Sequence, residues 1–181
     1  MRNLSGHLLF AGPALWDPNF RRTVVLIGQH DEDGAVGVVL NRVAELTVAE
    51  AAPPLAPIVA EGDPLFVGGP VEPASAVVVA DFVEPEQAQI LAVGSIGFLP
   101  PEVPAEALES LRRARVFAGY AGWGPGQLEL EMAEEGSWIA EPATADDIFT
   151  DDPDGLWSAV LKRKGPGFDL LRFMPLDPSW N

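Results

Sequence analysis

Short runs of apolar residues separated by turn residues dominate the first half of the chain. The runs over residues 4–11, 23–30 and 35–40 are rich in strand formers, and Asp31-Glu32-Asp33-Gly34 separates the last two. A polar turn with glycine between two such runs is typical of a β-hairpin. The pattern therefore predicts three strands, of which the second and third form a hairpin.

More strands are predicted further along the chain. The turn Gly68-Gly69-Pro70 lies between two of them, and Gly94 and Gly97 lie within a third. These strands cover residues 65–67, 74–82, 90–98 and 115–120.

Helices are predicted where a capping residue precedes apolar residues at helical spacing. Thr47 and Glu50 have capping-box spacing, and Thr144 with Asp147 begins a second short helix. Residues 127–132 alternate like a strand, but the surrounding Pro125 and Gly136 favour a helix. A further helix is predicted from Pro104 through Leu108 and Leu111. Another is predicted from Asp152-Pro153 to Gly165, and its apolar residues that face the core are Leu156, Trp157, Val160 and Leu161.

Strands grouped in runs, with short and unevenly spaced helices, predict an α+β fold with a largely antiparallel sheet. No linker, repeat or shift in composition divides the 181 residues. Residues 1–181 are therefore predicted to form a single domain.

Charge and composition narrow the classes of function. The net charge of −16 creates a field that repels nucleic acid and anionic membranes. No apolar run approaches the roughly 20 residues of a membrane span, and the N-terminus lacks the apolar core of a signal peptide. The absence of cysteine fits a reducing compartment. We expect a cytoplasmic protein that has no nucleic-acid or membrane partner.

Two basic clusters remain within this acidic chain. They are Arg112-Arg113-Arg115 and Lys162-Arg163-Lys164. Each is predicted near the C-terminal end of a helix, where cations complement the helix dipole.

His30 is the candidate catalytic base, because it ends a predicted strand beside Asp31. A Ser-His-Asp arrangement is formally possible, but no serine lies in a Gly-x-Ser-x-Gly elbow. The alternative is a strand-end histidine that bonds neighbouring backbone. The acidic clusters at residues 31–33 and 146–154 lack calcium-loop spacing, so we expect turn and capping roles, with no metal and no cofactor.

The glycine-rich segment from Gly119 to Glu129 has the layout of a phosphate-binding loop before a helix. No Lys-Ser/Thr follows its glycines, and Glu129 and Glu131 would repel a phosphate. The segment is therefore predicted to be an architectural turn, with positive φ at one or more of Gly122, Gly124 and Gly126.

A ligand site is predicted from residues that follow strands, because neighbouring strand ends gather loops at one edge of a sheet. Such a site would combine a cation, an amide, bare backbone and an aromatic wall. The alternative is that these loops are scattered and each only turns the chain. The candidate residues are Asn41, Arg42, Gly68, Gly69, Trp123 and Gln127.

Six short blocks stand out when the chain is taken as a whole. They are Gly6-His7-Leu8-Leu9 with Ala11-Gly12-Pro13, then Asp17-Pro18-Asn19-Phe20, His30 with Gly34-Ala35-Val36-Gly37, Val39-Leu40-Asn41-Arg42, Gly68-Gly69-Pro70-Val71, and Gly119-Tyr120-Ala121-Gly122-Trp123 with Pro125-Gly126-Gln127-Leu128-Glu129. In order and spacing, from about Leu4 to Trp157, these blocks resemble the YqgE/AlgH family.

The resemblance implies a bacterial, cytosolic domain whose sheet is bifurcated into a pseudo-barrel. It implies no settled activity, although a transcriptional-regulator label accompanies part of the family. Three classes of function stay open: a binding or regulatory protein for a small molecule or protein, a hydrolase-like enzyme that uses His30, and a structural or partner-binding domain.

We expect no direct DNA binding at physiological salt, because the net charge opposes the phosphate contacts that dominate such affinity. Fluorescence anisotropy with labelled duplex DNA measures this directly. A sub-micromolar complex that weakens with added salt would contradict the expectation.

Overall fold

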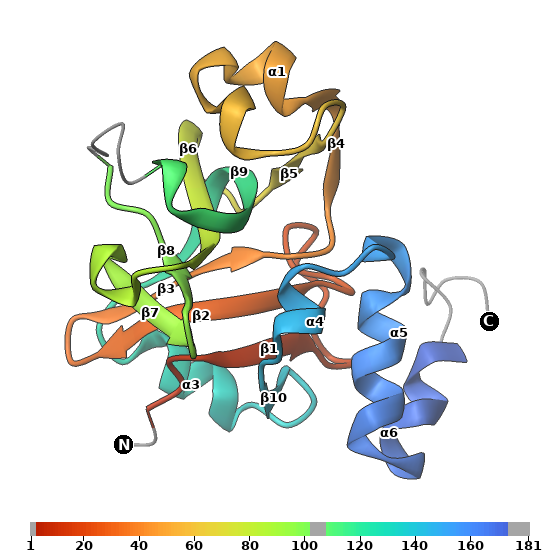
Figure 1. Ribbon diagram of the computed structural model, residues 1–181. Coiled ribbons are helices and arrows are strands. Elements are labelled where there is room, and N and C mark those ends of the chain that lie inside the picture. The colour runs from red at the N-terminus through yellow and green to blue at the C-terminus, as the bar shows by residue number, and fades with distance from the viewer. Residues whose placement is uncertain (1–2, 102–107, 174–181) are drawn as a thin grey trace.

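Strand β9 (Leu111–Trp123) runs through the middle of the sheet and belongs to both of its halves (Figure 1). The structure, a computed structural model, describes residues 3–101 and 108–173. Within them the strands follow the order β10-β1-β2-β3-β9-β6-β8-β7, and β4 and β5 attach beside β9. The other strands are β1 (His7–Ala11), β2 (Val24–Asp31), β3 (Gly34–Val39), β4 (Val43–Thr47), β5 (Pro64–Val67), β6 (Val71–Phe82), β7 (Ile90–Val93), β8 (Ile96–Phe98) and β10 (Trp138–Pro142).

The helices are short and lie around this sheet. They are α1 (Val48–Ala51), α3 (Gln127–Ala133), α4 (Ala145–Ile148), α5 (Pro153–Lys164) and α6 (Pro166–Asp169), with 3₁₀ turns η1 (Pro53–Ile58), η2 (Pro85–Gln87) and η3 (Leu170–Phe173). Figure 1 shows α4, α5 and α6 beside β1 and β10, and α1 at the far end of the molecule. None of the described helices is long and apolar enough to cross a membrane.

The sheet splits along one edge of β9. Phe117 of β9 pairs with Phe66 of β5 in parallel, whereas Ala121 pairs with Gly37 of β3 in an antiparallel ladder. The opposite edge of β9 pairs with β6. We call β10-β1-β2-β3 the first branch and β6-β8-β7, with β4 and β5, the second branch. The predicted α+β class and largely antiparallel sheet are confirmed, and the sheet is bifurcated and does not close.

Glycines make the split possible, because backbone meets backbone there. Gly119 has φ +68°, and a Cβ on it would lie 2.6 Å from the Gly69 carbonyl oxygen and 2.8 Å from that of Val71. A Cβ on Gly69 would lie 2.2 Å from the Tyr120 carbonyl oxygen. Any larger residue would push the turn between β5 and β6 away from β9, since real Cβ atoms do not approach so closely.

Most locally encoded predictions are confirmed. β2 and β3 form the predicted hairpin. Thr47 caps α1 and Thr144 caps α4, each with a reciprocal capping box. The segment after Pro125 is helical, and Gly126 has the positive φ predicted for the glycine-rich turn, +73°.

The long helix α5 covers one face of the first branch. Its residues Leu156, Trp157, Val160 and Leu161 are buried as predicted, and Gly165 follows its last residue. The Trp157 indole donates a hydrogen bond to the Ala11 carbonyl oxygen at 3.0 Å, which ties the helix to β1.

Three predictions about elements need correction or fall outside the described chain, and two strands were not predicted. Residues 90–98 form two strands, because Gly94 at φ +57° turns the chain into a hairpin. The cluster at Arg112 lies on β9 and not at a helix end, whereas the cluster at Lys162 does occupy the last turn of α5. Strands β4 and β10 were not predicted, and the helix from Pro104 falls largely in residues 102–107, outside the described residues.

Gly119→Ala is expected to destabilise the fold by about 3 kcal/mol or more, from left-handed strain of about 1–2 kcal/mol plus overpacking of about 1–3 kcal/mol. Gly94→Ala is the matched control, because it also has positive φ but no atom within 4 Å of the added Cβ, and should cost only about 1 kcal/mol. Urea unfolding of both variants measures the difference. Equal losses of unfolding free energy in the two variants would contradict the proposed need for glycine at position 119.

Candidate functional site

A cavity of about 510 Å³ opens between the two branches of the sheet. It is larger than three other cavities lined by described residues, whose volumes are about 270, 60 and 250 Å³. Its volume falls within the range of about 300–1,000 Å³ typical of small-molecule sites.

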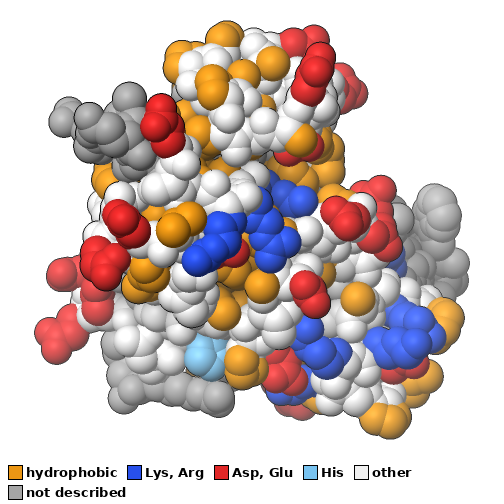
Figure 2. All heavy atoms as spheres, viewed as in Figure 1, with side chains coloured by type: hydrophobic (Ala, Val, Ile, Leu, Met, Phe, Trp, Pro, Cys, Tyr) orange, Lys and Arg blue, Asp and Glu red, His pale blue; other side chains and the backbone are white. Residues whose placement is uncertain are grey.

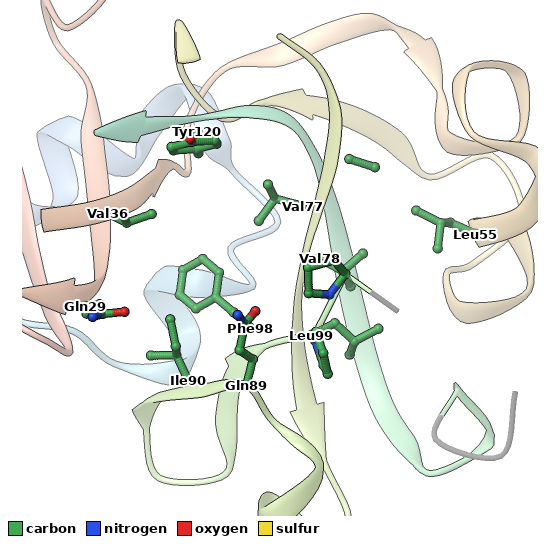
Figure 3. Close-up of a pocket in the computed structure, with 13 residues that line it drawn as sticks. Gln29, Val36, Leu55, Val77, Val78, Gln89, Ile90, Phe98, Leu99 and Tyr120 are labelled. Atoms are coloured by element: carbon green, nitrogen blue, oxygen red, sulfur yellow. The ribbon is translucent and has the colours of Figure 1, made fainter. Parts of the chain in front are cut away.

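Apolar side chains from both branches form the walls of this interbranch cavity (Figure 3). Val36 comes from the first branch, Val77 and Phe98 come from the second, and Leu55 of η1 contributes from beyond β6. A ligand held here would therefore contact both branches at once.

Three neutral polar side chains lie among these walls, namely Gln29, Gln89 and Tyr120. The Gln29 amide nitrogen donates to the Asp31 carboxylate, which lowers the pKa of Asp31. Figure 3 shows the Gln29 oxygen on the side of the cavity. The Gln89 side chain and the Tyr120 hydroxyl make no hydrogen bond to the described residues. None of the described lining residues is charged, so this part of the cavity suits a neutral ligand with an apolar body and a hydrogen-bonding edge.

Asn41 and Arg42 hold the loop that precedes β2. The Asn41 side chain accepts from the Val24 amide at 2.8 Å and donates to the Arg22 carbonyl oxygen at 2.9 Å. Arg42 donates to the Pro18 carbonyl oxygen at 2.8 Å, and its partial burial lowers the pKa of its guanidinium. Both side chains therefore fix the path of the chain between β1 and β2.

Trp123 and Gln127 meet at one carboxylate. The indole nitrogens of Trp123 and Trp138 both donate to Glu131 Oε2, each at 2.9 Å, and Gln127 Nε2 donates to Glu131 Oε1 at 2.9 Å. Trp123 is only 5% exposed, and its ring stacks on Phe20 with centroids 6.0 Å apart. Glu131 therefore organises this cluster.

The six predicted ligand residues fall into three groups. Asn41 and Arg42 lie at the loop before β2, Gly68 and Gly69 at the split, and Trp123 and Gln127 at Glu131. None of the six lines any of the four cavities. Contact between these residues and a ligand stays a prediction.

The candidate base His30 is buried and has both ring nitrogens engaged. The Leu4 backbone N–H donates to Nδ1 at 3.1 Å, so the ring proton must be on Nε2, which lies 3.0 Å from Glu129 Oε1. The Ser5 hydroxyl accepts from the His30 main-chain N–H, not from its ring. The ring therefore offers no free lone pair to a substrate in this geometry.

The acidic clusters have the turn and capping contacts that their sequence suggested. Asp31 accepts from the Asp33 amide, Asp152 caps α5, and Asp147 both completes the α4 capping box and pairs with Arg163 at 2.9 Å. Within residues 3–101 and 108–173, no three acidic, histidine or cysteine side chains are grouped to hold a metal ion.

Glu131→Ala is expected to cost about 2–6 kcal/mol, because it leaves two buried indole N–H groups without an acceptor, at about 1–3 kcal/mol each. Glu131→Gln keeps one oxygen for both indoles and should cost about 1 kcal/mol or less. Glu135→Ala, at an exposed position, is the control and should stay within about 0.5 kcal/mol. Urea unfolding followed by tryptophan fluorescence measures all three, and equal losses for the Ala and Gln variants at Glu131 would argue against the shared acceptor.

Comparisons with known proteins identify the family of the chain. A family model described as AlgH-like matches residues 8–169. A UPF0301 protein from Streptomyces avermitilis is 43% identical, over 99% of this chain and 96% of its own length, and one from Myxococcus xanthus is 41% identical, over 91% and 93%. Among solved structures, a protein from Corynebacterium diphtheriae has a TM-score of 0.83 at 27% identity, and the match covers 96% of this chain and 94% of that one. The AlgH protein from Pseudomonas aeruginosa has a TM-score of 0.72 at 29% identity, and the match covers 97% of this chain and 96% of that one. The chain belongs to the AlgH-like family.

Proposed function

We propose that this chain is a non-catalytic binding protein of the bacterial cytoplasm, whose ligand is a small neutral molecule held in the interbranch cavity. The observation that carries the proposal is the lining of that cavity by described residues, which are apolar apart from three neutral polar side chains and include no charged one. Apolar walls with a few placed polar groups are typical of small-molecule sites.

The geometry of His30 favours binding over hydrolysis. A general base needs a lone pair within reach of the substrate, and in His30 the Nδ1 lone pair accepts the Leu4 amide. His30 also does not line the interbranch cavity. The hydrolase alternative would therefore need a general base other than His30.

The position of the cavity supports a regulatory role. Its walls come from both branches, so a ligand that prefers one spacing of the branches would shift the protein toward that arrangement. Such a shift is a means of signalling to a partner protein without any chemical step.

Charge pairing supports the proposed absence of DNA contact. Arg112 pairs with Asp81 at 2.9 Å, Arg163 with Asp147 at 2.9 Å and Lys164 with Glu141 at 2.9 Å. Figure 2 shows cationic groups on the viewed face with acidic groups close by. Cations held by carboxylates are poor counterions for phosphate.

A thermal-shift screen with neutral and charged metabolites tests the proposal. A ligand at 100 times its dissociation constant adds about 2.7 kcal/mol, which corresponds to roughly 5–10 °C in melting temperature for a chain of this size. We expect the hits to be neutral, and Ala76→Phe, which places a ring in the cavity, to abolish their shift.

Ala74→Phe is the matched control, because it adds the same ring on the same strand at a residue that does not line the cavity. It should leave the shift intact. Arg42→Ala tests the site predicted from sequence, and should also leave the shift intact. A shift that survives Ala76→Phe but is lost in Arg42→Ala would refute the interbranch site and favour the sequence-derived one.

A further inference from the structure

A second cavity, of about 270 Å³, lies where α3 packs beside the N-terminal segment. Its walls are the apolar side chains of Leu4, Leu128, Met132, Ala133 and Ala140. Its remaining lining residues are His30 and Glu129. This lining differs from that of the interbranch cavity, because it contains a carboxylate.

The Glu129 carboxylate is held in place by a buried histidine. Its Oε1 lies 3.0 Å from His30 Nε2, and the Leu4 N–H bonded to Nδ1 at 3.1 Å fixes which nitrogen carries the proton. The His30 side chain is only 1% exposed, so the imidazole cannot turn away. His30 is thus a positioning residue for Glu129.

The second carboxylate oxygen of Glu129 is available to a ligand. Oε2 makes no hydrogen bond or ion pair with the described residues, and the side chain is 34% exposed. The site therefore combines an oriented anionic acceptor with an apolar wall of leucine, methionine and alanine.

We propose that this second cavity binds a small organic ammonium ion, with its charged end on Glu129 Oε2 and its apolar body against Met132 and Leu128. A charge-assisted hydrogen bond to the carboxylate supplies the specificity, and methionine adapts to varied apolar shapes. The volume lies just below the range of drug-sized sites, which favours a free small amine over a lysine within a peptide. The net charge of −16 concentrates cations near the protein and repels anions.

The test uses the full-length protein labelled with ¹³C in its methionine methyl groups. The chain has three methionines, and the methyl signal of Met132, which lines the cavity, reports on binding there. Benzylammonium and benzyl alcohol are titrated in parallel, because they share a ring and differ in charge. We expect the Met132 signal to shift with benzylammonium at about tenfold lower concentration than with the alcohol.

Two variants separate the carboxylate from the overall charge. Glu129→Gln should remove the preference for benzylammonium, whereas Glu135→Gln, which removes one negative charge from an exposed residue of the same region, should keep it. If Glu129→Gln does not fold, the comparison of benzylammonium with benzyl alcohol on the natural protein still tests the proposed ammonium site.

Three results would overturn the assignment: equal affinity for both probes, an unchanged preference in Glu129→Gln, or tighter binding of a capped lysine peptide than of benzylammonium. These outcomes are independent of the interbranch cavity, because none of the described residues lines both cavities.

Discussion

The whole architecture depends on one close crossing of backbone, where Gly68-Gly69 passes Gly119-Tyr120. The Gly68 amide donates to the Ala118 carbonyl oxygen, and the Gly68 carbonyl accepts from Val39, so the crossing joins β9, β5 and β3. Only glycine permits this approach. Because β9 leaves β5 for β3 at this point, the sheet opens into two branches, and the interbranch cavity lies between them.

Local signals in the sequence were sufficient to predict the elements that are stabilised by neighbouring residues. The hairpin at Asp31 to Gly34, the capping box at Thr47 and the helix after Asp152 each follow from side chains within a few positions. The arginines from Arg112 were misplaced because the long strand β9 is stabilised by partners distant in sequence, and pairing with them overrides local helix signals.

The candidate sites were harder to predict from the sequence, because they depend on contacts between residues far apart in the chain. His30 and Glu129 are 99 positions apart, and no spacing in the sequence connects them. The blocks around Asn41 and Trp123 were predicted to contact a ligand, and their described contacts fix the loop near Pro18 and the carboxylate of Glu131. The walls of the interbranch cavity, such as Val77 and Phe98, look like ordinary strand residues, and only the split of the sheet gives them a shared surface.

The central claim is that the space between the branches is a site for neutral ligands. A crystal soaked separately with benzamide and with benzoate tests it most directly, because the two molecules have nearly the same shape and differ in charge. The account predicts benzamide in the interbranch cavity, with its ring against Phe98 and its amide toward Gln29 or Tyr120, and no benzoate there. Equal occupancy by both molecules, or benzamide bound only outside this cavity, would contradict it.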